Sequence, residues 1–234
     1  MRNFLYPEEA SQILRLAENK RDLMYFATAL YLGTRHNETA SVRWKDLIEL
    51  EGPRKEFKLY TSKQKKYRIV KMQEEYREIV KKCWGYKELT ELVAPSRWSA
   101  STAWDKMTDQ GGRNLCAKYF DLAGVPDNVQ RGTHVLRRTF GRSFYINNGK
   151  SHDALLYLSR YFRHSNIDTT CVYIGLTSDV LGDMTSRVTY EITANQTELN
   201  YLERTSLKKF LEDCPELINL LEKTKPEYDW RFLR

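Results

Sequence analysis

The most apolar stretch of the chain lies between Leu23 and Leu32 and is interrupted by Thr28. It is far shorter than the roughly 18 apolar residues that a membrane span needs. Gly33, a residue type that often ends helices, follows it directly. The stretch therefore predicts a core helix over residues 22–32. With 234 residues, of which 41% are hydrophobic, the chain can bury a full core as one domain, or as one domain with an appendage.

The patterns around this helix predict a mainly α-helical fold with one small antiparallel β-sheet (α+β). The segment Tyr6-Pro7-Glu8-Glu9 opens a first helix, because proline suits the first turn and acids suit the positive end of the helix dipole. Further helices are predicted over residues 37–43, 73–84, 99–109, 111–123, 133–147, 153–162 and 168–174. Strand-like runs predict the sheet over residues 46–50, 56–61 and 67–72.

Residues 190–234 differ from the rest of the chain in charge and in pattern. They carry a net charge of −2, whereas residues 1–189 carry +9, within a total of +7. Leucines between Leu199 and Leu221 recur at steps of three and four residues, which predicts an amphipathic helix pair. We therefore divide the chain into a basic domain, residues 1–189, and a helical tail, residues 190–234. The charge of the basic domain makes nucleic acid the first candidate for a partner, and a solvated basic surface with no ligand stays open as the alternative.

Basic residues are most concentrated between the second and third predicted strands. From Arg54 to Lys71 there are eight lysines or arginines and one acid, Glu56. The segment Ser62-Lys63-Gln64-Lys65-Lys66 predicts an exposed turn. Such a cluster either protects a sheet edge from aggregation or contacts phosphate groups.

Common metal, nucleotide and hydrolase motifs do not occur in the sequence. The four cysteines form no Cys-x-x-Cys pair, and neither His-Glu-x-x-His nor Gly-x-Ser-x-Gly is present. Gly149-Lys150-Ser151 imitates the end of a P-loop, but Phe144 occupies the position of the first glycine. We therefore expect no metal ion and no cofactor. The scattered cysteines and the polar N-terminus favour a cytoplasmic protein with no membrane partner.

Three motifs place basic and phenolic side chains at intervals that suit phosphate chemistry. Arg35 stands at a helix break. His134 and Arg137 lie three residues apart in the first turn of a predicted helix, so both project from one face. His164 and Tyr173 lie nine residues apart across a short predicted helix. Each motif alone is weak, but their order along the chain is informative.

In this order the motifs resemble the catalytic domain of tyrosine recombinases, the phage integrase family, over about residues 5–178. The matching segments are Leu32-Gly33-Thr34-Arg35 with Glu38, Val42-Arg43-Trp44-Lys45-Asp46, His134-Val135-Leu136-Arg137-Arg138-Thr139-Phe140, and the spacing from His164 to Tyr173. The resemblance implies the fold of that domain. It also implies site-specific recombination or integration of DNA, in which strands are cut and rejoined through a 3′-phosphotyrosyl intermediate without metal or ATP.

The resemblance implies catalytic roles that also make chemical sense. Arg35 and Arg137 would hold the non-bridging oxygens of a DNA phosphate and remain charged at any pH. Tyr173 would be the nucleophile and His134 its general base, because a phenol with a pKa of about 10 needs help to ionise. His164 would donate a hydrogen bond to the phosphate.

The leaving 5′ oxygen needs a proton, and Lys63 is our choice for the general acid, with Lys65 and Lys66 as competitors. The residues expected to contact DNA are Lys65, Lys66, Arg68, Arg138 and Arg163. Among their neighbours, we expect Glu38 to hold the Arg35 loop, Trp44 to lie in the core, and His36 and His152 to lie at the surface.

The chain departs from the family pattern at its front and at Arg163, which stands where a glycine usually precedes the late histidine. Without the usual helical DNA-binding domain ahead of it, we expect a fragment or a minimal protein that binds duplex DNA weakly and in a salt-sensitive way. Family members imply a homo-tetramer on DNA, and a monomer or weak oligomer when free. The tail would then dock on the basic domain in cis or in trans.

Two other functions remain open at this point. A type IB topoisomerase would use the same residues but reseal the same strand. A non-catalytic DNA-binding protein would be expected to lack some of the catalytic residues, and this chain retains all of them.

Overall fold

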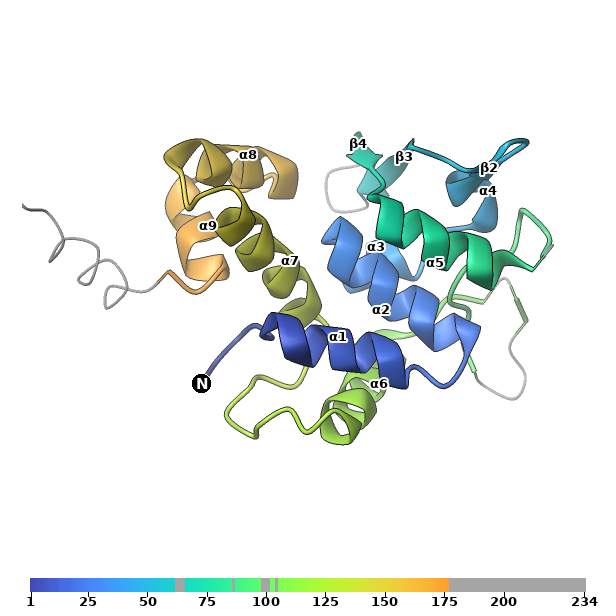
Figure 1. The fold of residues 1–234 in the computed structure, drawn as a ribbon, viewed down its shortest axis with the longest axis horizontal. Helices are drawn as coiled ribbons and strands as arrows, with labels where there is room; N and C mark the ends of the chain where they lie inside the picture. Colours follow the sequence, from blue (N-terminus) through green and yellow to red (C-terminus); the bar gives the residue numbers. More distant parts are fainter. Residues whose placement is uncertain (62–65, 86, 98–101, 104, 177–234) are drawn as a thin grey trace, which may run out of the picture. The chain divides into compact units, whose positions relative to one another are not determined.

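Helix α2 lies at the centre of the computed structural model, which describes residues 1–61, 66–85, 87–97, 102–103 and 105–176 (Figure 1). It spans Lys20–Leu32 and is largely buried; Met24 and Phe26 have no exposed surface. The Asn19 side chain accepts a hydrogen bond from the backbone at its start, and Gly33 ends it with a left-handed φ of 55°. The predicted core helix is confirmed, and it begins at residue 20 rather than 22.

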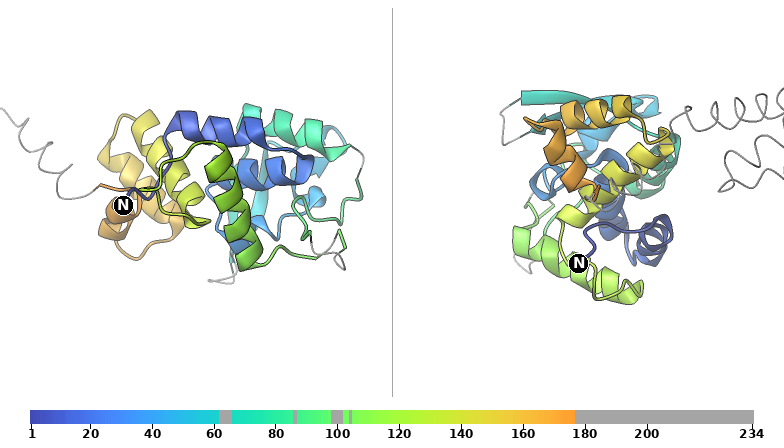
Figure 2. Two further views of the ribbon diagram at one scale, coloured as in Figure 1. Left: turned by 90° about the horizontal axis from the view of Figure 1, so that it is seen from below. Right: turned by 90° about the vertical axis from the view of Figure 1, so that its left-hand side faces the viewer.

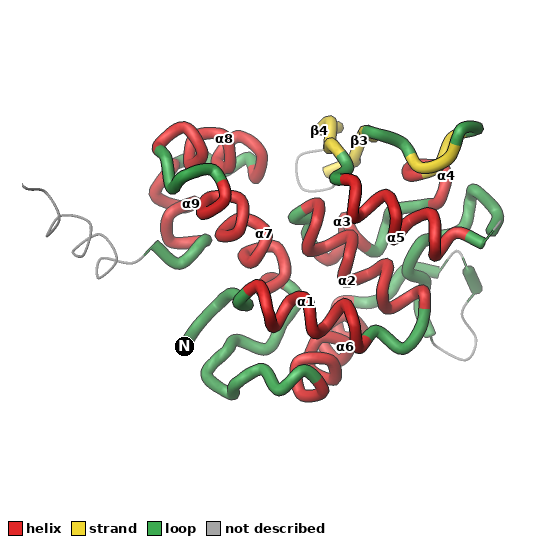
Figure 3. The backbone as a smooth tube through the Cα atoms, viewed as in Figure 1, coloured by secondary structure: helices red, strands yellow, loops and turns green. Residues whose placement is uncertain are grey.

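Helices dominate the part of the chain that is described, with two short pairs of strands (Figure 3). The other helices are α1 (Pro7–Leu16), α3 (His36–Thr39), α4 (Trp44–Leu47), α5 (Glu74–Trp84), α6 (Asp109–Leu122), α7 (His134–Asn147), α8 (His152–Phe162) and α9 (Ile167–Tyr173). The strands are β1 (Ile48–Glu49), β2 (Gly52–Pro53), β3 (Glu56–Thr61) and β4 (Lys66–Lys71). The predicted fold class is confirmed. Among these helices, none is long and apolar enough to cross a membrane.

The strands form two separate antiparallel pairs, β1–β2 and β3–β4, rather than the single sheet that we expected. The prediction of a strand over residues 46–50 is wrong in its first half, which belongs to α4. The backbone of Arg43 donates to the Asp46 carboxylate at 2.8 Å, and this bond closes a helical turn that buries Trp44 in the core as predicted. β3 has its predicted bounds, and the lysine-rich tip, residues 62–65, lies outside the described residues.

The predicted helix over residues 99–109 is wrong at the described residues 102–103 and 105–108. Lys106 forms an isolated antiparallel bridge with Pro95, and the Asp105 carboxylate accepts hydrogen bonds from Thr102. α6 then begins at Asp109, because the Thr108 side chain caps it. The helix predicted over residues 37–43 is also shorter in the structure, where α3 ends at Thr39.

One apolar cluster, the main core, joins the inner faces of α1, α2, α5 and α6 with strand β3 and the start of α7. The α8–α9 segment, residues 152–173, lies beside α7 and outside this cluster (Figure 2). Its own buried side chains include Leu158 and Phe162, which are 0% and 1% exposed. The tail, residues 190–234, lies outside the described residues, so its predicted helices and boundary stay predictions.

Candidate active site

Arg35 is held at the start of α3 by a carboxylate three residues later. The Glu38 carboxylate accepts hydrogen bonds from the Arg35 backbone at 3.0 Å and from its Nη1 at 3.1 Å. Glu38 is 3% exposed, whereas the Arg35 side chain is 27% exposed. The contact agrees with the expectation that Glu38 holds the Arg35 loop, and it leaves part of the guanidinium facing solvent.

Two more arginines reach the same carboxylate from distant parts of the chain. Arg137 of α7 donates from Nη1 to Glu38 at 3.5 Å and to the Gly33 carbonyl at 2.6 Å. Arg68 of β4 donates from Nη2 to Glu38 at 3.4 Å. Three guanidinium groups against one carboxylate leave a net charge of +2 at this point. Such an unbalanced cluster is suited to an anion.

The arginines also contact the last turn of α8. Arg35 and Arg137 both donate from Nη2 to the Phe162 carbonyl, at 3.4 Å and 3.3 Å. The Arg137 guanidinium carbon lies 4.2 Å from the centre of the Phe162 ring. Burial and, to a smaller extent, the charge of Arg35 lower the pKa of Arg137 to about 10. Arg137 therefore remains charged at neutral pH.

Tyr173 and His134 come together although 39 residues separate them. The Tyr173 hydroxyl lies 3.5 Å from His134 Nδ1. The Tyr173 ring packs edge-to-face on Phe162 and His164, with centroid distances of 5.5 Å and 5.2 Å. The Arg138 guanidinium carbon lies 5.0 Å from the centre of the same ring. The phenol therefore lies among the predicted basic residues.

The protonation states of this pair follow from burial and from the arginines. Burial raises the pKa of Tyr173, against the charges of Arg137, Arg138 and Arg35, which lower it. Burial lowers the pKa of His134, and the charges of Arg138 and Arg137 add to that effect. At neutral pH the phenol therefore holds its proton and the imidazole is neutral, which is the state in which His134 can accept a proton.

His164 follows a strained turn at the end of α8. Arg163 occupies the left-handed region with a φ of 56°, a backbone conformation that favours glycine. Its Nη2 donates to the Tyr67 carbonyl at 2.8 Å. His164 Nδ1 lies 2.9 Å from the hydroxyl of Thr170, which is fully buried, and this contact orients the imidazole.

The remaining predicted residues fare differently. Lys63 and Lys65 lie outside the described residues, and Lys66 is exposed at the start of β4. Arg138 donates to Gln130 at 3.0 Å. The Arg68 side chain is 7% exposed, and both of its terminal nitrogens donate to protein acceptors, so its expected contact with DNA stays a prediction.

The two histidines expected at the surface differ from each other. His152 is exposed, as predicted. His36 is 8% exposed, so its prediction is wrong. Its ring nitrogens bond to the Tyr25 hydroxyl at 2.8 Å and to the Met107 carbonyl at 3.1 Å, which hold the ring inside. Packing of α6 against α3 buries it, and Gly112 of α6 allows the close approach.

Sequence reasoning missed the shared use of Glu38 and the part played by Phe162. Sequence reasoning also missed that Arg68 faces inward, because alternation alone does not say which face of a strand is buried. β4 alternates exposed and buried residues, and Arg68 occupies a buried position between the exposed Tyr67 and Ile69. A charged residue in an inward position of a strand is typical of a functional or ion-paired site.

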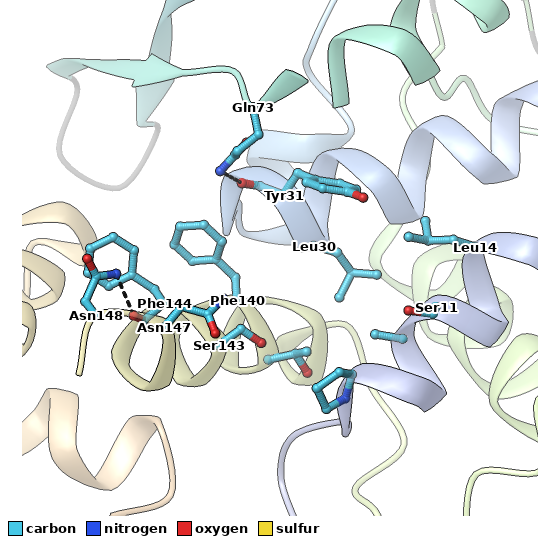
Figure 4. A pocket seen from close by; sticks show the side chains of 13 residues that line it. Ser11, Leu14, Leu30, Tyr31, Gln73, Phe140, Ser143, Phe144, Asn147 and Asn148 are labelled. Carbon is cyan, nitrogen blue, oxygen red and sulfur yellow. Dashed lines mark hydrogen bonds between the residues drawn. The ribbon is translucent and has the colours of Figure 1, made fainter. Parts of the chain in front are cut away.

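A separate groove of about 450 Å³ lies between α1, α2 and α7, away from these residues (Figure 4). Apolar side chains of Leu14, Leu30, Phe140 and Phe144 line it together with polar ones such as Ser11. None of the predicted catalytic residues is among its lining residues. Within the described residues, no group of three or more His, Cys, Asp or Glu side chains could hold a metal ion.

Comparison with known proteins gives one family. The model of the phage integrase family matches residues 3–179. No curated protein sequence matches the chain. Similar solved structures include XerA recombinase (20% identity, TM-score 0.60, 80% of this chain and 64% of that one) and XerH recombinase bound to a palindromic difH substrate (18%, 0.58, 79% and 52%). A lambda integrase dimer bound to a COC′ core site is also similar (14%, 0.53, 74% and 48%). The chain thus spans about half to two thirds of the length of these proteins.

Proposed function

Because the chain belongs to the phage integrase family, we propose that it is a tyrosine-type site-specific recombinase, which cuts and rejoins duplex DNA. The observation that supports this most strongly is the convergence of four side chains from three elements. Arg35 and Arg137 share Glu38 and the Phe162 carbonyl, and Tyr173 lies 3.5 Å from His134 beside them. Distant segments that bring a nucleophile, a base and two phosphate ligands to one place suit phosphoryl transfer.

A DNA phosphate binds at the arginines. The solvent-facing part of Arg35 and the net charge of +2 around Glu38 attract its non-bridging oxygens. The bonds from these arginines to the Phe162 carbonyl are long, at 3.3–3.4 Å, so a phosphate oxygen competes well for the same donors. His164 adds a further donor to the phosphate.

The Tyr173 oxygen then attacks phosphorus, and the bond from phosphorus to the 5′ oxygen breaks. The phenolic proton passes to His134, which is neutral at neutral pH because burial lowers its pKa. A lysine of the β3–β4 hairpin, Lys63 by our choice, gives its proton to the departing 5′ oxygen. The product is a 3′-phosphotyrosyl linkage and a free 5′ hydroxyl, and attack by a 5′ hydroxyl of another strand reverses these steps.

The protein works on DNA as a homo-tetramer, and the tail connects its protomers. Deletion of residues 190–234 therefore lowers assembly on DNA without removing a catalytic side chain. Unchanged assembly after this deletion contradicts docking in trans.

Covalent capture tests the proposal without knowledge of the DNA site. The full chain is incubated with a pool of nicked duplexes of randomised sequence, in which cleavage releases a short strand and traps the enzyme. We expect a protein–DNA adduct on a denaturing gel, which disappears in Tyr173→Phe. The matched control is Tyr157→Phe, which removes a hydroxyl from a tyrosine that is 55% exposed on α8, and the adduct persists.

The alternatives have different outcomes in the same experiment. A non-catalytic DNA-binding protein retains DNA on a native gel but forms no adduct. A topoisomerase forms the adduct and relaxes supercoiled plasmid, yet joins no strand from a second duplex that carries the captured sequence. An adduct that persists in Tyr173→Phe contradicts the choice of nucleophile.

A further inference from the structure

We propose that Arg68 is a positioning residue for strand cleavage, which acts through Glu38 to hold Arg35 and Arg137 in place. This inference rests on the proposed function, since it concerns the same site. It differs from our expectation from sequence, in which Arg68 contacts DNA. The argument follows from where β4 places the side chain, what it contacts and what charge it adds.

β4 turns Arg68 toward the protein interior. Arg68 pairs with Leu59 of β3 across the hairpin, and both side chains are buried, with 9% and 4% exposure. Ile69, its neighbour in β4, is 60% exposed instead. Because side chains alternate along a strand, a shift of the pairing by one residue would bury Ile69 and expose Arg68. Burying a charge is costly unless it is paired, so the inward arginine needs acceptors.

The acceptors belong to two other elements of the site. Arg68 donates from Nη1 to the Tyr161 carbonyl in the last turn of α8 at 3.0 Å, and from Nη2 to Glu38 of α3 at 3.4 Å. Its guanidinium carbon lies 4.2 Å from the centre of the Tyr161 ring. One planar group thus joins the lysine-bearing hairpin to the element that holds Arg35 and to the turn before His164.

The contacts of Arg68 parallel those of the two phosphate-binding arginines. Arg35 and Arg137 each donate to Glu38 and to the Phe162 carbonyl, one residue beyond the acceptor of Arg68. Arg68 has much less access to solvent than Arg35, with side-chain exposures of 7% and 27%. A phosphate that takes donors from Arg35 and Arg137 therefore leaves Arg68 in place, where it keeps Glu38 and the end of α8 from moving.

The buried position of Arg68 is better explained by its effect on the geometry of the site than by its contribution to folding stability. The Nε of Arg68 is buried and has no hydrogen-bond partner among the described residues. A buried guanidinium with one unpaired donor costs free energy of folding compared with an apolar side chain at the same position. The same guanidinium sets the orientation of Glu38, whose two oxygens must face Arg35 and Arg137 at once. Misplacement of such groups by about 1 Å lowers rates by up to about 100-fold.

The test measures two quantities for each variant. One is the rate of covalent capture at saturating DNA, and the other is the DNA concentration at which the rate is half of that value. We expect Arg68→Gln to lower the saturating rate by about 10- to 100-fold and to leave the half-saturating concentration within about twofold. Arg68→Lys keeps the charge but loses the guanidinium, so it recovers part of the rate. Lys71→Gln, which removes one exposed charge from the same strand, leaves the saturating rate unchanged.

A double variant shows whether Arg68 acts through Glu38. If it does, Glu38→Gln with Arg68→Gln is no slower than Glu38→Gln alone. Multiplied effects overturn the inference. So does a weaker affinity of Arg68→Gln for DNA at an unchanged saturating rate, because Arg68 is then a DNA contact. A lower melting temperature with an unchanged rate per folded molecule also overturns it, since the role is then structural only.

A DNA-free measurement separates this inference from the proposed function. Inorganic sulfate serves as the probe of the arginine pair, and its affinity is measured by calorimetry. We expect Arg68→Gln to weaken sulfate binding several-fold although its side chain is buried, and Lys71→Gln to leave it unchanged. If the wild-type chain forms no adduct but the sulfate results hold, the proposed function fails and the positioning of Arg35 and Arg137 stands. Equal sulfate affinity in wild type and Arg68→Gln overturns the positioning.

Discussion

The main core and the α8–α9 segment are built on different principles. The main core joins apolar side chains of several helices, such as Phe26 and Tyr119, whose rings meet at 5.0 Å. The α8–α9 segment lies beside α7 (Figure 1). Arginines from β4 and α7 donate hydrogen bonds to carbonyls in the last turn of α8. Arg35 and Arg137 extend from elements anchored in the main core, whereas Tyr173 is carried by the α8–α9 segment.

This difference bears on how the proposed nucleophile, Tyr173, is held beside the proposed phosphate site. The arginines that are suited to hold a phosphate also hold the end of α8, through the Phe162 carbonyl. Their bonds to it are longer than ordinary hydrogen bonds and so are weak. If a phosphate binds at Arg35 and Arg137 as proposed above, it therefore competes for the same donors that hold the end of α8.

The largest expected effect is a loss of folding stability on substitution of Glu38, whose carboxylate lies between the two regions. Glu38→Gln leaves three guanidinium groups without their counter-charge, and removing one partner of a buried ionic cluster costs about 3–5 kcal/mol. Urea unfolding measures the loss. The matched control is Glu18→Gln, which alters an exposed ion pair with Lys118 and should change the midpoint little. Equal effects in the two variants would contradict the central role of Glu38.

Two buried phenylalanines sharpen the comparison further. Phe26→Leu and Phe162→Leu should each lower the free energy of unfolding by about 1–2 kcal/mol, since the rings are 0% and 1% exposed. Phe162 also contacts Arg137, Tyr173 and His164. Capture at saturating DNA should therefore slow about tenfold in Phe162→Leu and stay unchanged per folded molecule in Phe26→Leu. The same rate in both would show that the two regions are not distinct in function.

The pH dependence of cleavage probes the contact that crosses the two regions. Because burial lowers the pKa of His134 below 6.5, the imidazole stays neutral down to a pH under that value. The capture rate should be flat near neutral pH and then fall about tenfold per unit as the pH drops through the pKa of His134. His134→Gln should be slow throughout and lack this acid limb. If the rate of His134→Gln still falls at acid pH, the group that titrates is not His134.

The smallest expected effect is a change in thermal stability on substitution of Arg163, in the turn between α8 and α9. Arg163 has a φ of 56°, which costs a non-glycine residue about 1 kcal/mol. Arg163→Gly and Arg163→Ala both lose the hydrogen bond to Tyr67, but only glycine relieves the backbone. The glycine variant should therefore be more stable than the alanine variant by about 1 kcal/mol in thermal unfolding. Equal stabilities would show that the turn is unstrained.

Local patterns predicted many of the helices and strands that the structure describes. Gly33 ends α2 and β3 has its expected bounds, because caps and strand alternation depend on neighbouring residues. The predicted helix over residues 99–109 is wrong at residues 102–103 and 105–108, where a bridge between Lys106 and Pro95, eleven positions apart, overrides the local pattern. His36 is buried for a similar reason, since α6 covers it.

The sequence by itself determined which side chains are available for phosphate chemistry, their order along the chain and the helix or strand that bears each one. Only the tertiary structure decided that Glu38 serves three arginines, and that Arg68 points inward while Arg35 keeps access to solvent. Contacts between α3, β4, α7 and α8 create this arrangement, and such long-range contacts leave no periodic trace in the sequence. The physical reason is that a charge is held inside a protein by partners that folding brings together, rather than by its neighbours in the chain.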